Sequence, residues 1–470
     1  MHRLFSTTEI IAAILTKDDS ETALLLQCLQ VNRRFSHEAV RILWRRCGTG
    51  FPPTLRCREP TIGDLVKIAA RDMSRAQYYA NCIHELRFLH SPEDWPRPLG
   101  DPWYNCFLDL RFPALDSLTA GSGEMDDDVG LARVFNEFLG EWLERPWRVE
   151  SSPNLKALHL VLNKSYSFEG IEGAIWFINF SPILSSLSID LSFNIWPLAL
   201  LKSLAALPKL HKLQGKYLST QLLKDLSEEF PVLEELYTKY AGSLDIIPSL
   251  FPCLSVLTLE LSQPIHEGLG SLVGLSLLTS LDLTYPEGSS ISGPDLLALA
   301  HGCPKLENIR LPGASELMMG EPCPRGESID DTTIDIFARA LPKLEVFTFG
   351  LKNRSILTYK AVVSLARYCP ELGYFHITAD IFIPDLIQGL EEAGKELGAA
   401  PLPSVSFMTF YLDEDIQHKY GDFRSLASRL APLTPGLCEF SITDGSEDDD
   451  EFQVQVDSIA CFQGMSLSQA

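Results

Sequence analysis

The sequence predicts an α/β solenoid preceded by a small three-helix unit, and three observations support this fold class. A Pro-x-Leu-x-x-apolar-x-apolar motif recurs between residues 113 and 442. Helical patterns of apolar residues lie between successive copies of the motif. The first 48 residues lack the motif and carry three short amphipathic segments instead. A repeated strand–helix unit whose apolar face only a neighbouring unit can cover builds a solenoid.

The spacing of the motif and its Leu-x-x-Leu-x-Leu core are typical of leucine-rich repeats, which usually run roughly 20–29 residues and are long and irregular here. The last two apolar positions alternate, so they lie on one face of a short strand and point into the core. The copies occupy residues 152–160, 181–189, 207–213, 230–236, 251–259, 276–283 (without the Pro), 303–311, 341–349, 369–377, 402–410 and 434–442, with a weaker first copy at 112–118. A two-layer α/β domain with chance repeats is the alternative, and the number of copies in register favours the solenoid.

Helices are expected between the strands. Thr358 is a candidate cap for a helix over 358–369, and Pro294 stands where the first turn of a helix over 293–303 tolerates proline. A third such pattern covers 219–230. The Pro of the next motif biases the residue before it away from helical geometry, so it ends each helix and starts the next strand.

The composition excludes several functional classes. A net charge of −23 and a pI of about 4.8 argue against a reader of the nucleic-acid backbone, which needs clustered Lys and Arg. The start of the sequence has no apolar core of a signal peptide, and no apolar stretch is long enough to span a bilayer. The 11 cysteines form no Cys-x-x-Cys pair, which favours buried thiols and a cytosolic or nuclear protein.

The sequence contains no recognised catalytic motif, so we expect neither an enzyme nor a cofactor. Phosphate-binding, zinc-protease, nucleophile-elbow and dinucleotide signatures are all absent. The acidic run at 447–451 lacks the spaced ligands of a calcium loop and indicates a solvated charge run. Cys323 beside Arg325 is more consistent with a loop thiol than with a reactive one. No metal site is predicted.

The first 48 residues predict three short helices. Ser6 to Glu9 form a capping box before a first apolar run, a second short helix is centred on Leu25, and Ser36 can cap a third. So small a unit buries little apolar surface by itself and usually needs an external surface to cover the rest.

The order of these residues resembles the F-box. Thr8-Glu9-Ile10 stands for the Pro-Glu-Ile of the family, with Thr in place of its usual Pro, and Ile42-Leu43-Trp44 gives the Leu-Trp ending often found in fungal members. The resemblance covers about a tenth of the chain. It implies docking on a Skp-type adaptor and, through it, on a cullin–RING ubiquitin ligase. The residues that it implies for adaptor binding are Leu4, Ile10, Ile11, Ile14, Leu25, Cys28, Val31, Arg33, Phe35, Leu43 and Trp44.

F-boxes joined to leucine-rich repeats form a known combination, in which the repeats hold the substrate. The resemblance therefore implies a substrate-recognition subunit of a Skp–cullin–F-box ligase, with residues 1–48 as F-box, 49–112 as a helical and Pro-rich connector, 113–445 as repeats and 446–470 as an acidic tail. The alternative is a stand-alone repeat scaffold or inhibitor whose N-terminal helices cap the array. The distance from this segment to the weak first repeat at 112 favours the F-box.

The alternation also predicts which strand positions face away from the core. These positions are mostly small and polar, which suits a protein or peptide surface, and three tyrosines can serve as anchors. For any one position, a solvated strand residue is the simpler interpretation. The candidate substrate-binding residues are His159, Ser188, Tyr237, Thr258, Asp282, Arg310, Thr348, Tyr374, His376 and Tyr411.

Overall fold

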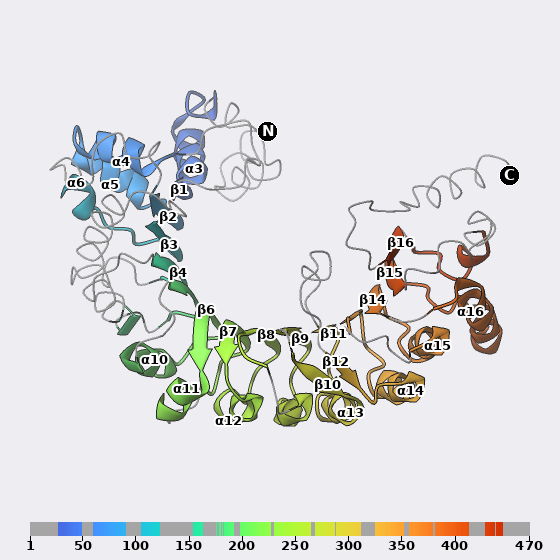
Figure 1. Cartoon of the computed structure of the whole chain (residues 1–470). Coiled ribbons are helices and arrows are strands. Elements are labelled where there is room, and N and C mark those ends of the chain that lie inside the picture. The colour runs from blue at the N-terminus through green and yellow to red at the C-terminus, as the bar shows by residue number, and fades with distance from the viewer. Residues whose placement is uncertain are drawn as a thin grey trace. The chain divides into compact units, whose positions relative to one another are not determined.

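The structure is a computed structural model of the 470-residue chain. It describes residues 27–48, 60–90, 105–122, 154–162, 175, 178–179, 181, 183–191, 198–226, 230–264, 268–286, 288–311, 325–351, 357–378, 381–412, 428–437 and 439–444. The chain divides into two compact units, Met1–Lys216 and Tyr217–Ala470. Each unit is an α/β stack of strand–helix coils (Figure 1). Among the described helices, none has the length and apolar character needed to cross a membrane.

The first unit carries parallel strands that follow one another in chain order. Parallel strands in chain order require every connection to return along the same side, which is the geometry of a solenoid. Its described elements are α3 (Arg33–Leu43), β1 (Arg46–Gly48), α4 (Ile62–Ala69), α5 (Met73–Ala80), β2 (Glu85–His90), α6 (Asn105–Leu108), β3 (Ser117–Ser122), β4 (Ala157–Leu162), β5 (Ser186–Leu191), α10 (Leu198–Ala205) and β6 (Lys212–Ser219), the last of which crosses the boundary.

The parallel ladder begins earlier in the chain than the sequence indicated. β1 pairs with β2, and β2 with β3, so coils start near residue 45 rather than at 112. A column of backbone hydrogen bonds of 2.8–2.9 Å repeats from coil to coil, starting with His84 N–H to Arg45 C=O and Asp116 N–H to His84 C=O. The connector expected over 49–112 to be helical in part contains two helices, α4 and α5, and Thr61 forms a capping box with Asp64. The stretch expected to be a connector is therefore part of the array.

The second unit repeats this plan. Its main sheet runs β7-β8-β9-β11-β13-β14-β15-β16, every described pair is parallel, and β10 and β12 form a separate two-stranded sheet. The elements are α11 (Thr220–Leu226), β7 (Glu235–Ala241), η3 (Leu244–Ile246), α12 (Ile247–Leu250), β8 (Val256–Leu261), η4 (Leu269–Gly274), β9 (Ser280–Thr284), β10 (Ser290–Ser292), α13 (Gly293–Gly302), β11 (Asn308–Leu311), β12 (Arg325–Glu327), α14 (Asp331–Ala340), β13 (Val346–Phe349), α15 (Tyr359–Tyr368), β14 (Tyr374–Thr378), α16 (Ile383–Leu397), β15 (Phe407–Leu412) and β16 (Glu439–Asp444).

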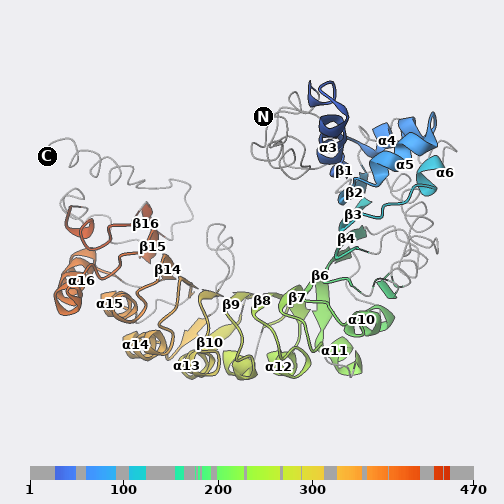
Figure 2. The ribbon, with the colours of Figure 1, turned by 180° about the vertical axis from the view of Figure 1, so that it is seen from behind.

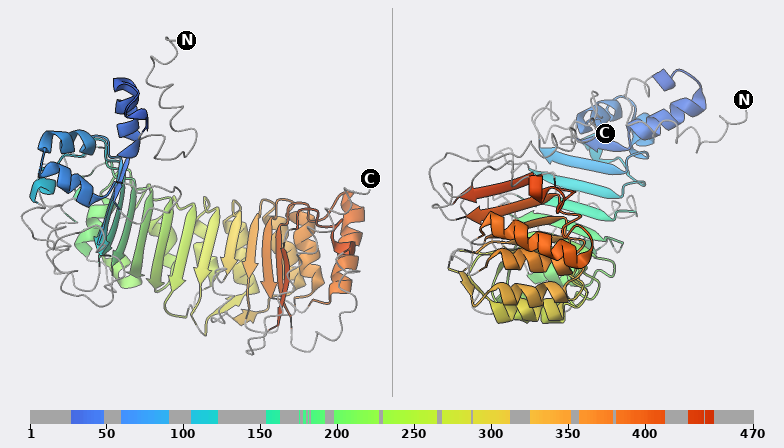
Figure 3. Two further views of the ribbon diagram at one scale, coloured as in Figure 1. Left: turned by 90° about the horizontal axis from the view of Figure 1, so that it is seen from above. Right: turned by 90° about the vertical axis from the view of Figure 1, so that its right-hand side faces the viewer.

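The helices of this second unit lie along one face of its sheet, as the two opposite views show (Figures 1 and 2). The strands stand side by side when the sheet is seen from above (Figure 3). We call the other face of the second unit's sheet, which these helices do not cover, the helix-free face. On the helix side, each strand contributes a buried apolar residue to one continuous row, namely Leu257, Leu281, Ile309, Phe347 and Phe375.

The recurring Pro has the expected role in the second unit. Helices α13 and α15 end at cysteine C-caps, Cys303 and Cys369, directly before Pro304 and Pro370. Both thiols are buried and donate to backbone carbonyls of the preceding coil, Cys303 to Leu272 C=O at 3.5 Å. Thr358 caps α15 as predicted, and Ser292 caps α13, where Pro294 lies in the first turn. The leucine-rich-repeat solenoid predicted from the sequence is therefore confirmed.

Candidate interaction surfaces

Most of the predicted substrate-binding residues lie in one row across the helix-free face. Strand register places Tyr237, Thr258, Asp282, Arg310, Thr348 and His376 opposite one another on six successive strands. Neighbouring strands lie about 4.8 Å apart, so the row is a continuous strip of side chains. The alternation read from the sequence therefore brings these residues together as expected, although their role in binding stays a prediction.

The part of this row on β7 to β11 is charged and accessible. Two positions along the strands from the row, Lys239 forms an ion pair with Glu260 on the next strand, and both side chains are about half exposed. Tyr237 donates its hydroxyl to Glu235 at 3.3 Å. Asp282 is less exposed, at 25%, and its Oδ2 lies 3.9 Å from Arg310 Nη1. Burial raises the pKa of Asp282, and the charge of Arg310 lowers it by less.

The part of the row on β13 and β14 differs from the prediction. Thr348 is 0% exposed and His376 only 5%, so our expectation that both are exposed is wrong. The alternation shows which way a side chain points but cannot show what covers that face. Burial lowers the pKa of His376 to about 4, because the protonated ring would lose its hydration. At Thr348 and His376 the helix-free face is consequently buried and uncharged.

Of the three predicted anchor tyrosines, Tyr237 lies in the row, whereas Tyr374 and Tyr411 lie beside it. Tyr374 is partly buried and precedes His376 by two residues on β14, in the register of Glu235 and Asn308 on the earlier strands. Tyr411 pairs with Thr378 on the other side of the row. The two positions flank His376 on the same face, since positions two apart on a strand share a face.

His159 and Ser188 belong to the first unit and are neighbours there. They stand in a row with Arg87, Thr119 and Gln214 on β2, β3 and β6. Sequence reasoning missed Arg87 because its strand lacks the Pro of the motif. The signal was nevertheless present as Ile83-x-x-Leu86-x-Phe88, which matches the Leu-x-x-Leu-x-Leu pattern but has no Pro before it.

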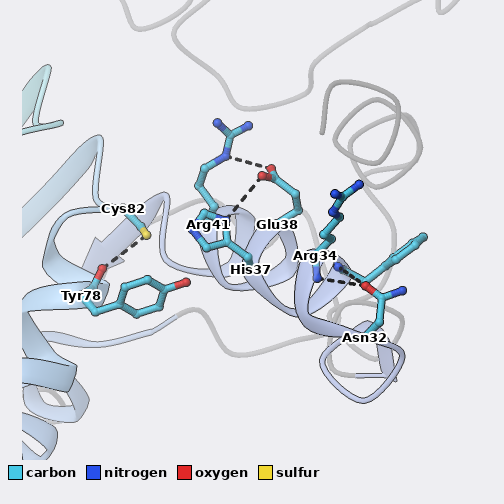
Figure 4. A network of polar contacts seen from close by, with 8 residues as sticks. Asn32, Arg34, His37, Glu38, Arg41, Tyr78 and Cys82 are labelled. Atoms are coloured by element: carbon cyan, nitrogen blue, oxygen red, sulfur yellow. Dashed lines mark hydrogen bonds and ion pairs between the residues drawn. The ribbon is translucent and has the colours of Figure 1, made fainter. Parts of the chain in front are cut away.

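The N-terminal segment shows one described helix, α3, and a small core beside it. Buried Cys28 and Ala39 pack with Leu29, Phe35, Ile42 and Leu43. Asn32 caps the helix by accepting from the backbone N–H groups of Arg34 and Phe35 (Figure 4). The predicted adaptor-binding residues Leu4, Ile10, Ile11, Ile14 and Leu25 lie outside the described residues.

The described adaptor-binding candidates have different surroundings. Cys28, Phe35 and Leu43 belong to the small core, whereas Val31 is 61% exposed and Arg33 is also exposed. A large apolar side chain left mostly in water at the start of a helix suits a docking position. These placements are compatible with the predicted role and leave it untested.

Helix α3 is attached to the first coil through α5. The Trp44 ring stacks on Tyr79 with 4.7 Å between centroids and planes 2° apart. His37 meets the Tyr78 ring edge-on, and the buried Glu38 carboxylate pairs with Arg41 at 3.1 Å (Figure 4). Trp44 then leads directly into β1. This segment thus adjoins the array, and the separation that favoured the F-box over a cap in the sequence does not exist.

A shallow hollow of about 370 Å³ lies beside α16. Glu391, Lys395, Pro401 and Leu433 are among its lining residues, and Glu391 is bridged by Arg429 at 2.8 Å. Among the described residues, no three His, Cys, Asp or Glu side chains gather as a metal site would require.

No protein-family model matches the chain, and no curated protein matches it at a significant level. Solved structures of low identity do match. The Rad7 and Elc1 complex in yeast gives 15% identity and a TM-score of 0.41 over 84% of this chain and 94% of that chain. The leucine-rich repeat-containing protein LegL7 from Legionella pneumophila gives 13% and 0.29, over 82% and 98%. A leucine-rich-repeat protein of Leptospira interrogans gives 14% and 0.35, over 78% and 91%. The fold assignment rests on strand register, not on these likenesses.

Proposed function

We propose that the chain is a non-catalytic receptor of a Skp–cullin–F-box ubiquitin ligase. Its N-terminal segment docks on a Skp-type adaptor, and its repeats hold a protein substrate. The mechanism is proximity, because a substrate held on the ligase meets the ubiquitin-loaded enzyme at a high effective concentration. No covalent chemistry is assigned to the chain itself.

The exposure of Val31 carries the adaptor half of the proposal. Val31 follows Cys28 and precedes Arg33 and Phe35 in the order that the F-box resemblance requires. It is 61% exposed, while Cys28, three residues earlier, is buried in the small core. A three-helix unit that keeps such a side chain in water gains stability when a partner covers it.

The helix-free face carries the substrate half. Its accessible section on β7 to β11 offers an aromatic ring, hydroxyls and charges in fixed register. Groups of this kind, held rigidly by a parallel sheet, suit recognition of a protein surface.

Co-purification with a co-expressed Skp-type adaptor tests the adaptor half. The full-length chain is used, since removing residues 1–48 would also delete β1 and expose β2. Val31→Asp is expected to reduce adaptor binding by about 2–4 kcal/mol, because a charge enters an apolar contact. Val273→Asp is the matched control, since Val273 is also exposed, at 42%, but lies in the second unit. Adaptor binding that is absent, or equal in the two variants, contradicts the proposal.

A stand-alone repeat scaffold is the second candidate, and one observation favours it. Trp44 stacks on Tyr79, and the chain enters β1 immediately afterwards, so α3 covers the first coil as a cap would. Failure of the full-length chain to bind any Skp-type adaptor, together with unfolding of the first unit on Trp44→Ala, would establish the cap.

A further inference from the structure

The helix-free face contains a carboxylate, Asp282, that receives no hydrogen bond from the described protein groups. Asp282 is 25% exposed, and Arg310 Nη1 stands 3.9 Å from it, which is beyond hydrogen-bond distance. Within the part of the chain that the structure describes, no hydrogen bond reaches this carboxylate. Burial raises the pKa of Asp282 despite the nearby guanidinium. An ionised carboxylate can accept several hydrogen bonds, so this one has capacity for a further donor.

Asp282 has an uncharged neighbour in the row on the side of β8. Arg310 lies on β11, whereas Thr258 and Tyr237 lie on β8 and β7, on the opposite side of Asp282. With strands about 4.8 Å apart, the Tyr237 backbone is about 10 Å from that of Asp282. An aromatic ring, a hydroxyl and a carboxylate in this order can contact the stem and the head of a cationic side chain.

The charge balance of this face decides between an acidic and a basic partner. Lys239 and Arg310 are its cations, and Lys239 is already paired with Glu260. Over β7 to β11, the described carboxylates of this face are Glu235, Glu260 and Asp282, which outnumber these two cations. The whole chain carries −23, so its field repels acidic segments and attracts basic ones.

We propose that the helix-free face over β7 to β9 binds a basic peptide segment of a protein partner. An Arg or Lys side chain of that segment donates to Asp282 and lies along Thr258 and Tyr237. The inference rests on the protein-binding role of the repeats proposed above, but not on adaptor docking.

The test is selection of random twelve-residue peptides displayed on phage against the immobilised full-length chain. Dissociation constants of the selected peptides are then measured by fluorescence anisotropy in 0.15 M salt. The selected peptides are expected to be enriched in Arg or Lys. Asp282→Asn is expected to weaken their binding tenfold or more. Asp225→Asn removes an equal charge from the exposed surface of α11 and is expected to change binding less than twofold.

Thr258→Arg provides a second variant, because its side chain would occupy the approach to Asp282 from β8. It is expected to abolish peptide binding, while the thermal midpoint confirms that each variant is folded. Acidic or uncharged peptides, no selected peptides, or an equal loss in Asp282→Asn and Asp225→Asn would each overturn the proposal. Adaptor co-purification is measured in a separate experiment. Failure of the peptide selection therefore contradicts the basic-peptide proposal and leaves the test of adaptor docking unaffected.

Discussion

Two sections of one strand row differ in a way that the repeat does not explain. On β7 to β11, the row holds Tyr237, Thr258, Asp282 and Arg310, which are at least partly accessible. On β13 and β14, it holds Thr348 and His376, which are buried. Both sections have the same parallel register and the same alternation. The comparison teaches that a repeat fixes the direction of a side chain, while the cover over each face decides whether it meets a partner or the protein interior.

A charge placed in each section gives the largest expected difference. Thr348→Asp puts an ionised carboxylate at a fully buried position and is expected to lower the free energy of unfolding by more than about 3 kcal/mol. Thr258→Asp, in the same row, is expected to cost about 1 kcal/mol, because its position is partly exposed and the new charge meets only the like charge of Asp282 opposite it. Urea unfolding of the two variants measures both values. Equal losses would remove the distinction between the sections.

Acid is expected to affect the buried section through His376. Its folded pKa of about 4 lies below the usual 6.5, so the unfolded chain binds a proton that the native chain excludes. Stability is therefore lost as pH falls from 6.5 to 4, by about 3 kcal/mol at 1.36 kcal/mol per pKa unit. The measurement is the free energy of unfolding at several pH values for the native chain and for His376→Gln. A slope that persists unchanged in the variant assigns the loss to other groups.

Asp282→Asn tests the accessible section by removing the charge of its least exposed carboxylate. Since burial raises the pKa of this carboxyl, its charge costs stability, and the cost grows as pH rises through that pKa. The neutral, equally sized amide is expected to raise the free energy of unfolding by up to about 1 kcal/mol at pH 7. Denaturant titration at pH 7 and pH 4 checks this, with a larger gain at pH 7. A clear loss of stability would show that Asp282 is a structural ion-pair partner of Arg310.

The smallest effect is expected at the Lys239–Glu260 pair. Both side chains are substantially exposed, at 40% and 54%, so water screens their attraction. A double-mutant cycle with Lys239→Ala and Glu260→Ala is expected to give a coupling energy of about 0.2–1 kcal/mol. A coupling energy well above this range would mean that water screens this ion pair less than its exposure indicates.

Much of the fold was predictable because its information is local. The apolar spacing Leu344-x-x-Phe347-x-Phe349 sets strand β13, and α15, which ends directly before Pro370, sets the return, all within one repeat. The strand at Ile83 to Phe88 was not predicted, because no Pro precedes its correctly spaced apolar residues. The expected start of the array therefore moved from residue 112 to near residue 45 once the coil-to-coil hydrogen bonds were known.

The candidate surfaces were predictable only in part. Register followed from alternation, so Tyr237 to His376 fell into one row as expected. The burial of Thr348 and His376 was not predictable, because alternation gives the direction of a side chain and not what covers it. The same holds for the stacking of Trp44 on Tyr79, which placed an expected adaptor contact against the first coil.

The column of backbone hydrogen bonds has a consequence for how the chain can change over evolutionary time. In the second unit, Thr279 donates to Ser255, Glu307 to Thr279, Glu345 to Glu307 and Gly373 to Glu345, each at 2.7–2.8 Å. Each coil thus donates a backbone hydrogen bond to the coil before it and accepts one from the coil after it, so the interface between neighbouring coils is the same each time. Duplication or loss of a whole coil leaves both interfaces intact. Such a chain can alter the length of its ligand-binding surface in steps of one repeat, without redesign of its core.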